Sequence, residues 1–112
     1  MAAAASVIDV AGIDVVVEGE GAHALVLVHG WPDTYRLWDA LVAHLLATCP
    51  GQFRCVRFTL AGFDTTRAPR PTSLQQMADL IGAIVDRVSA DAPVTLVLHD
   101  WGCVFGYEYL AQ

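Results

Sequence analysis

The amino-acid sequence predicts an α/β protein with a mostly parallel sheet. Short apolar runs of strand length alternate with segments of helical periodicity, in the order β-β-β-α-β-α-β-α. The hydrophobic content of 55% and the charged content of 16% indicate a well-filled core rather than disorder. A length of 112 residues allows one domain at most.

The first half of the chain predicts an initial antiparallel hairpin and then a buried strand. Two β-branched runs, residues 6–10 and 13–17, are separated by Ala11-Gly12, a pattern that is typical of a hairpin. A polar turn at residues 18–21 follows. The continuous apolar run at residues 24–28 predicts a strand that is buried on both faces.

A helix, a strand and a loop are predicted next. Residues 34–48 carry apolar side chains at three- and four-residue steps, which gives a helix with one apolar face. Asp33 is its predicted N-cap, and Pro50-Gly51 ends it. Apolar residues alternate with arginine and threonine at residues 53–60, which predicts a strand. The glycine and prolines of residues 61–72 predict a loop.

The last third of the chain predicts a helix, a strand and a final helix. Thr72-Ser73 followed by Gln75-Gln76 resembles a capping box, so a helix is predicted at about residues 74–88. The breaker Asp91-Ala92-Pro93 precedes an apolar strand at residues 94–98. A final apolar helix is predicted from residue 103 to residue 111.

Composition and charge exclude several classes of partner. The net charge of −6 and the scattered basic residues argue against nucleic acid and against membrane surfaces. No run approaches the roughly 20 apolar residues of a membrane span, and the first six residues lack the basic residue of a signal peptide. Three cysteines without CxxC spacing predict free thiols in a reducing compartment. We therefore expect a cytoplasmic protein.

Two tetrapeptides carry the chemistry that the sequence predicts. His29-Gly30-Trp31-Pro32 follows one apolar strand, and His99-Asp100-Trp101-Gly102 follows another. Ligand sites of open α/β sheets lie at the carboxyl ends of the strands, so both motifs belong on that edge. Asp100 stands at the apex of a sharp turn from strand to helix, and a carboxylate nucleophile suits displacement at a saturated carbon.

These motifs, in this order, resemble the α/β-hydrolase superfamily, and within it the epoxide hydrolase and haloalkane dehalogenase branch. The first motif looks like the HGxP oxyanion motif, and the second resembles the nucleophile elbow. The resemblance implies that Asp100 is the nucleophile and that the backbone N–H groups of Trp31 and Trp101 form the oxyanion hole. It implies structural roles in shaping these two loops for the remaining motif residues, His29, Gly30, Pro32, His99 and Gly102.

The resemblance also implies the class of substrate. Trp31 and Trp101 are expected to line a pocket for a small apolar organic molecule. An aromatic residue at position 31 favours epoxide hydrolysis, because haloalkane dehalogenases commonly carry asparagine there. Neither a phosphate-binding glycine motif nor metal-ligand spacing is present, so no cofactor and no metal are predicted.

Other interpretations of the same residues remain open. Asp100 could be only an N-cap of the last helix, and Cys103 could be a thiol nucleophile. The two tryptophans could simply cover the core. The chain could be a catalytically inactive truncated product that acts as a binding module, or it could be similar to a haloalkane dehalogenase.

Some positions depart from the family pattern. Leu98 stands where a small residue is usual, and Ala61 and Asp64 replace the common arginine and glycine of a family loop. The family's acid, its histidine and its cap domain would follow Gln112 in chain order. We therefore expect residues 1–112 to be the N-terminal part of an incomplete hydrolase domain. Because the strand at residues 94–98 would then lack a neighbour, the isolated chain is expected to self-associate.

Overall fold

The computed structural model describes residues 5–112, so residues 1–4 of the N-terminal segment considered above lie outside it. The elements follow the predicted order, with a short 3₁₀ helix in addition. They are β1 (Ala5–Val10), β2 (Ile13–Glu18), β3 (His23–Val28), the 3₁₀ helix η1 (Tyr35–Trp38), α1 (Asp39–Thr48), β4 (Phe53–Phe58), α2 (Leu74–Val88), β5 (Thr95–Leu98) and α3 (Trp101–Leu110).

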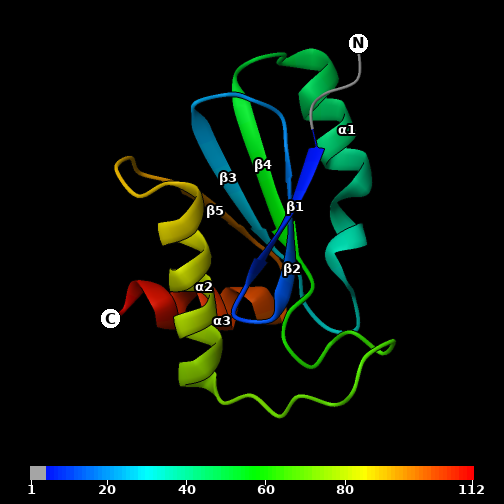
Figure 1. The fold of residues 1–112 in the computed structure, drawn as a ribbon, viewed down its shortest axis with the longest axis vertical. Coiled ribbons are helices and arrows are strands. Elements are labelled where there is room, and N and C mark those ends of the chain that lie inside the picture. Colours follow the sequence, from blue (N-terminus) through cyan, green and yellow to red (C-terminus); the bar gives the residue numbers. More distant parts are fainter. Residues whose placement is uncertain (1–4) are drawn as a thin grey trace.

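The five strands form one mixed sheet in the order β1-β2-β4-β3-β5. The initial hairpin is antiparallel, as predicted, and β2 also pairs antiparallel with β4. β3 pairs parallel with both β4 and β5, so the carboxyl ends of these three strands share one edge. The helix α1 lies on one side of the sheet, and α2 and α3 lie on the other (Figure 1). The α/β fold with an initial hairpin is therefore confirmed.

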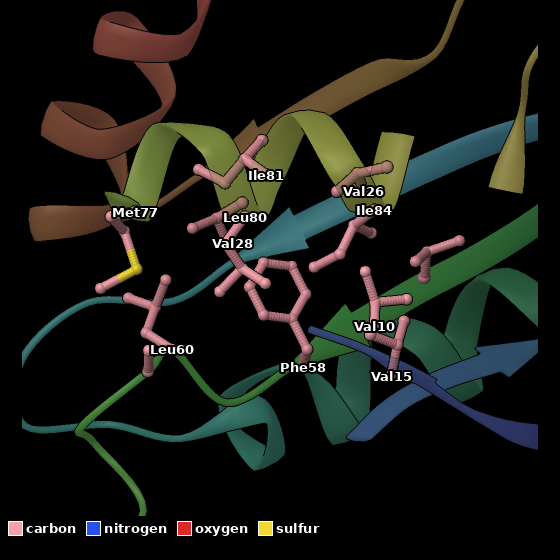
Figure 2. Packing of buried hydrophobic residues seen from close by; sticks show 12 residues of the cluster. Val10, Val15, Val26, Val28, Phe58, Leu60, Met77, Leu80, Ile81 and Ile84 are labelled. Carbon is pink, nitrogen blue, oxygen red and sulfur yellow. The ribbon is translucent and has the colours of Figure 1, made fainter. Parts of the chain in front are cut away.

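Apolar side chains fill both faces of the sheet. Figure 2 shows Val28 and Phe58 packed beneath Ile81 and Ile84 of α2. The opposite face carries a smaller cluster under α1, made of Leu25, Leu27, Trp38, Val42 and Cys55. Successive residues of β3 point to opposite faces, so its continuous apolar run is buried on both sides, as predicted.

The predicted helix at residues 34–48 is divided into two parts. The chain forms the short η1 first, and α1 begins only at Asp39. The prediction that Asp33 is the N-cap is wrong. Thr34 holds the cap position with an extended backbone, and its hydroxyl accepts a hydrogen bond from the Arg36 N–H. Asp33 belongs to the preceding turn, where its own N–H donates to the Gly30 carbonyl over 2.9 Å.

The helix α2 has the predicted bounds because its capping box is present. The Ser73 hydroxyl accepts from the Gln76 N–H over 3.1 Å, and the Gln76 side chain accepts from the Ser73 N–H over 2.8 Å. These two bonds satisfy backbone donors that have no partner within the helix.

A buried charge lies on the α1 side of the sheet. Arg57 of β4 is only 8% exposed, and its guanidinium forms ion pairs with Glu18 of β2 and Asp39 of α1. It also lies over the ring of Tyr35, 5.2 Å from the ring centroid. These contacts satisfy the buried cation and connect β2, β4 and η1. No helix among residues 5–112 has the length and apolar character that crossing a bilayer would require.

Candidate active site

The two motifs lie side by side because the strands before them are parallel neighbours. Val28 at the end of β3 is paired with Leu98 at the end of β5, and the His99 N–H donates to the Val28 carbonyl over 3.1 Å. The turn from β5 into α3 then brings Gly102 into close contact with the backbone of Val28. A Cβ on Gly102 would lie 2.4 Å from the Val28 carbonyl oxygen, so this close approach requires glycine.

Asp100 occupies the turn between β5 and α3 in a backbone conformation that residues other than glycine rarely adopt. Its φ is 55° and its ψ is −125°. Such conformations cluster at functional sites, where the surrounding structure must hold them in place. The turn directs the carboxylate toward the first motif, where Oδ2 accepts the backbone N–H of Trp31 over 2.9 Å.

Backbone amides keep this carboxylate ionised. The amide of Trp101, followed by that of Trp31, lowers the pKa of Asp100 below its ordinary value. Hydrogen bonds to a charged carboxylate favour the ionised form, which is the form needed in a nucleophile. The two amides that the sequence analysis named as oxyanion donors are thus the two that act on Asp100.

The interpretation of Asp100 as a helix cap receives no support. Asp100 holds the N-cap position of α3, but its side chain makes no capping hydrogen bond. The carboxylate instead turns to Trp31, 69 residues earlier in the sequence. A cap side chain would accept the N–H of the second or third helical residue.

Gly30 leaves the space that the carboxylate occupies. A Cβ at this position would lie 2.4 Å from the Asp100 Cβ and 2.6 Å from its Oδ2. Pro32 follows Trp31 through a cis peptide bond. The first motif therefore presents its backbone, not its side chains, to Asp100.

His29 is a fully buried hydrogen-bonding residue, for which the resemblance implied a structural role in shaping the loop. Its Nε2 accepts the Leu60 N–H over 2.9 Å, and its Nδ1 lies 2.8 Å from the Gly30 carbonyl oxygen. Burial lowers the pKa of His29, and this effect outweighs the opposing influences of the Gly30 carbonyl and Asp33. The imidazole is therefore neutral near pH 7 and connects the loops that follow β3 and β4.

Aromatic side chains surround the motifs. Trp31 is 66% exposed and Trp101 is 51% exposed, so both line the open edge of the sheet rather than a closed pocket. Trp31 packs edge to face against Phe63, and Trp101 stacks on Phe105. His99 packs edge to face against Trp38, on the α1 side. Phe63 was not named as a site residue from the sequence. It directly follows Gly62 in the loop that resembles a family loop, and an aromatic residue at that position could have indicated its role.

Cys103 is the third residue of α3 and lies in its first turn. Its thiol is partly buried and free, and its backbone N–H donates to the Asp100 carbonyl over 2.9 Å. All three cysteines of the chain are free thiols, including the buried Cys55. Among residues 5–112, no group of three or more histidines, cysteines and acidic residues is arranged to hold a metal ion.

A cavity of about 250 Å³ lies away from the two motifs, between the initial hairpin and the loop after β4. Its lining includes Ile13, Val16, Tyr35, Asp64 and Arg67, and none of its lining residues belongs to either motif. Because Asp100 does not reach this cavity, we do not assign the candidate site to it.

Two departures from the family pattern have local explanations. Leu98 packs its side chain over Gly106 of α3, where an added Cβ would lie 2.6 Å from the Leu98 Cδ1. The space normally left by a small residue on the strand is thus left by a glycine on the helix. Asp64 accepts hydrogen bonds from the Thr66 N–H and hydroxyl and pairs with Arg67, which also contacts Asp14 of β2.

Comparison with known proteins agrees with the fold. The family model of the alpha/beta hydrolase fold matches residues 23–112, so the chain belongs to this family. The chain is 39% identical over 107 residues to a probable oxidoreductase, EphD, of Mycobacterium tuberculosis. The aligned region covers 90% of this chain and 17% of EphD. It is 27% identical over 97 residues to a haloalkane dehalogenase of Sphingobium indicum, covering 82% of this chain and 31% of that enzyme.

The structure also resembles that of a solved epoxide hydrolase. The epoxide hydrolase VrEH1 from Vigna radiata superimposes with a TM-score of 0.77 at 26% sequence identity, covering 97% of this chain. The chain spans 35% of the length of VrEH1 and 17% of the length of EphD. The relatives therefore include epoxide hydrolases and haloalkane dehalogenases, and this chain corresponds to a minor part of each.

Proposed function

We propose that this chain provides the nucleophile and the oxyanion-binding amides of a hydrolase that acts on small apolar epoxides through an alkyl ester on Asp100. The observation that carries the proposal is the hydrogen bond between the Trp31 N–H and Asp100 Oδ2. It joins the two motifs and fixes one carboxylate oxygen. The other oxygen, Oδ1, is then the atom that attacks.

In the first step, Oδ1 forms a bond to a ring carbon of the epoxide, and the bond between that carbon and the ring oxygen breaks. The ring oxygen leaves with the electron pair of that bond and takes a proton from a general acid. No side chain among residues 5–112 is assigned this role. The ionised state of Asp100, favoured by the two amides, supplies the negative charge that this displacement needs.

In the second step, water adds to the carboxyl carbon of the ester, and negative charge develops on Oδ2. This oxygen already accepts the Trp31 N–H, so the donor is in place before the charge forms. The intermediate then collapses, releases the diol and restores the carboxylate. Activation of the water needs a general base. His29 does not suit this role, because both of its ring nitrogens already have hydrogen-bond partners.

The exposed aromatic rings support an apolar substrate. Trp101 follows Asp100 in sequence, Trp31 donates its N–H to the Asp100 carboxylate, and both rings are exposed at the open edge of the sheet. Apolar walls with a few polar groups are typical of sites for small organic molecules. A haloalkane would be displaced by the same attack, with halide as the leaving group, so halide release is the competing outcome.

Trapping the ester tests the proposal. The protein, in the form that its cells make, is mixed with styrene oxide in ¹⁸O-labelled water, quenched with acid and digested. We expect an adduct on the peptide that contains Asp100, and we expect the diol of a single turnover to carry unlabelled oxygen from the carboxylate. The Asp100→Asn variant should give no adduct, whereas Asp33→Asn, which alters a neighbouring carboxylate, should behave as the unmodified protein does.

Other results would select the alternatives. Halide release from 1-bromobutane without diol formation from epoxides would indicate a dehalogenase. An adduct at Cys103, or labelled oxygen in the first diol, would contradict the ester on Asp100. The absence of any adduct and any turnover would favour a binding module.

A further inference from the structure

The Gly30–Trp31 peptide group is held from both of its ends. Its N–H, which belongs to Trp31, donates to Asp100 Oδ2 over 2.9 Å. Its carbonyl, which belongs to Gly30, faces His29 Nδ1 at 2.8 Å and also accepts the Asp33 N–H over 2.9 Å. The orientation of this one planar group therefore decides whether the Trp31 N–H points at the carboxylate.

The contacts of His29 determine which of its nitrogens carries the proton. The Leu60 N–H can only donate, so Nε2 must present its lone pair. In the neutral ring the proton then lies on Nδ1, which donates to the Gly30 carbonyl. His29 is fully buried, so no bulk water competes for these bonds.

The bonds form a directed series from the loop after β4 to the candidate nucleophile. Leu60 donates to His29, His29 donates to the Gly30 carbonyl, and the N–H of the same peptide group donates to Asp100. Hydrogen bonds that run in one direction polarise one another, and a peptide whose carbonyl accepts a bond becomes a stronger N–H donor.

We propose that His29 is a positioning residue, whose Nδ1–H sets the orientation and donor strength of the Trp31 N–H toward Asp100. The consequence for catalysis rests on the function proposed above, but the effect on the Trp31 N–H does not. His29 touches neither the substrate nor the carboxylate in this arrangement. It acts through the Gly30–Trp31 peptide, and the Asp33 N–H provides the second anchor of the same carbonyl.

Two substitutions at one position separate the two bonds of His29. The amide nitrogen of an asparagine can take the place of Nδ1, so His29→Asn keeps a donor to the Gly30 carbonyl and loses the acceptor for Leu60. The amide oxygen of a glutamine can take the place of Nε2, so His29→Gln keeps the acceptor and loses the donor. Both variants remove the imidazole, which makes each the control of the other.

The readout is the backbone amide resonance of Trp31 in the protein as its cells make it, labelled with ¹⁵N-tryptophan and assigned with Trp31→Phe. In the unmodified protein we expect this proton to move as Asp100 ionises, because it lies in a charge-assisted bond. His29→Asn should retain most of that movement, and His29→Gln should lose most of it and should raise the pKa of Asp100. The amide of Trp38 is the internal reference, since Trp38 lies in the α1 cluster.

Activity adds a second measurement if the proposed function holds. His29→Gln should lower kcat with little change in KM, by less than the about 10²–10³ that removal of an oxyanion donor costs. His29→Asn should retain a higher kcat than His29→Gln. If the Trp31 pattern holds but Asp100 is never alkylated, the proposed function fails and the positioning role stands.

Three results would overturn the inference. The Trp31 amide proton could move by the same amount on ionisation of Asp100 in both variants and in the unmodified protein. That result would mean that the Asp33 N–H alone holds the Gly30–Trp31 peptide. Both variants could be perturbed equally, which would reduce His29 to a space-filling residue. If neither variant folds, ¹⁵N-histidine spectra of the unmodified protein decide, because a proton on Nε2 of His29 at neutral pH contradicts the donor to Gly30.

Discussion

Gly30 and Asp100, 70 positions apart, are in such close contact that a methyl group on Gly30 would occupy the space of the Asp100 side chain. The added carbon would lie 2.4 Å from the Asp100 Cβ, well inside any van der Waals contact. The contact explains why the first motif needs glycine before Trp31. The candidate site therefore depends on the absence of a side chain at Gly30 as well as on the carboxylate of Asp100.

Gly30→Ala should separate the Trp31 N–H from the Asp100 carboxylate. Because the added Cβ would displace the carboxylate from the position in which Oδ1 attacks, we expect the rate of ester formation from an epoxide to fall by about 10²-fold or more, the size of effect that misplacement of a reacting group can have. The measurement is single-turnover alkylation followed by mass spectrometry. Gly51→Ala is the control, because it adds strain at a positive φ but meets no atom within 4 Å. If Gly51→Ala slowed alkylation equally, general destabilisation would explain both variants.

The backbone of Asp100 predicts a conflict between stability and function. A residue with a Cβ is strained at φ 55° and ψ −125°, and glycine is not. Both Asp100→Gly and Asp100→Ala remove the carboxylate, so both should abolish alkylation. We expect the melting temperature of Asp100→Gly to exceed that of Asp100→Ala by several degrees.

Ser73 provides the matched control for that comparison, because it caps α2 with an ordinary φ of −75°. The difference between Ser73→Gly and Ser73→Ala measures the usual preference for glycine over alanine at an N-cap. The difference at Asp100 should be larger. Equal differences at the two positions would mean that the turn carries no strain.

Much of the fold was predictable because its signals are local. The capping-box pattern of Thr72-Ser73 and Gln75-Gln76 predicts that α2 begins near Leu74, and the structure shows that Ser73 and Gln76 form the box. The apolar run of β3 predicts a strand that is buried on both faces. The meeting of the two motifs was also predictable, since parallel strands bring their carboxyl ends to one edge. The resemblance named Trp31 and Trp101, and the structure shows a hydrogen bond from the Trp31 N–H to Asp100 Oδ2.

The remaining features depend on contacts between distant residues. No local pattern distinguishes Thr34 from Asp33 as a cap, because both residue types are good caps and the turn at Gly30 decides between them. Arg57 falls at a polar position of an alternating strand, yet it is buried because Glu18 and Asp39 neutralise it. Phe63 joins the site through its packing against Trp31 and His29, which lie more than 30 positions earlier in the sequence.

Leu98 and Gly106 should behave as a complementary pair. Gly106→Ala places a Cβ 2.6 Å from the end of the Leu98 side chain, so we expect a loss of about 1–3 kcal/mol in the free energy of unfolding. In a Leu98→Ala background the space is free, and the same change should be neutral or stabilising because alanine favours the helix. Urea unfolding of the four proteins gives the coupling energy. Additive effects would contradict the proposed compensation.

The chain of residues 1–112, produced alone, is predicted to self-associate. Among the described residues, β5 pairs along one edge with β3 and has no strand on its other edge. Large hydrophobic side chains are exposed on α3 at intervals of three residues, namely Trp101, Val104, Tyr107 and Leu110. Sedimentation velocity should show a concentration-dependent increase in mass, and Tyr107→Lys with Leu110→Lys should reduce it. A monomer at all concentrations, with cooperative melting, would contradict the prediction.

The burial of the neutral His29 imidazole predicts that the protein loses stability when the pH is lowered mildly. Burial holds the pKa of the folded-state imidazole below the ordinary value of 6.5. Well above pH 6.5 the ring is neutral in both the folded and the unfolded state, and its contribution to stability is complete. As the pH falls below 6.5, the unfolded chain binds the proton first, so the free energy of unfolding decreases until the pH reaches the folded-state pKa.

Urea unfolding between about pH 5 and pH 7 measures this slope. His29→Gln should flatten it, because glutamine does not titrate. His44→Gln, at an exposed position of α1, should leave the slope unchanged. A slope that survives in His29→Gln would assign the acid sensitivity to another group and would contradict a neutral, buried His29.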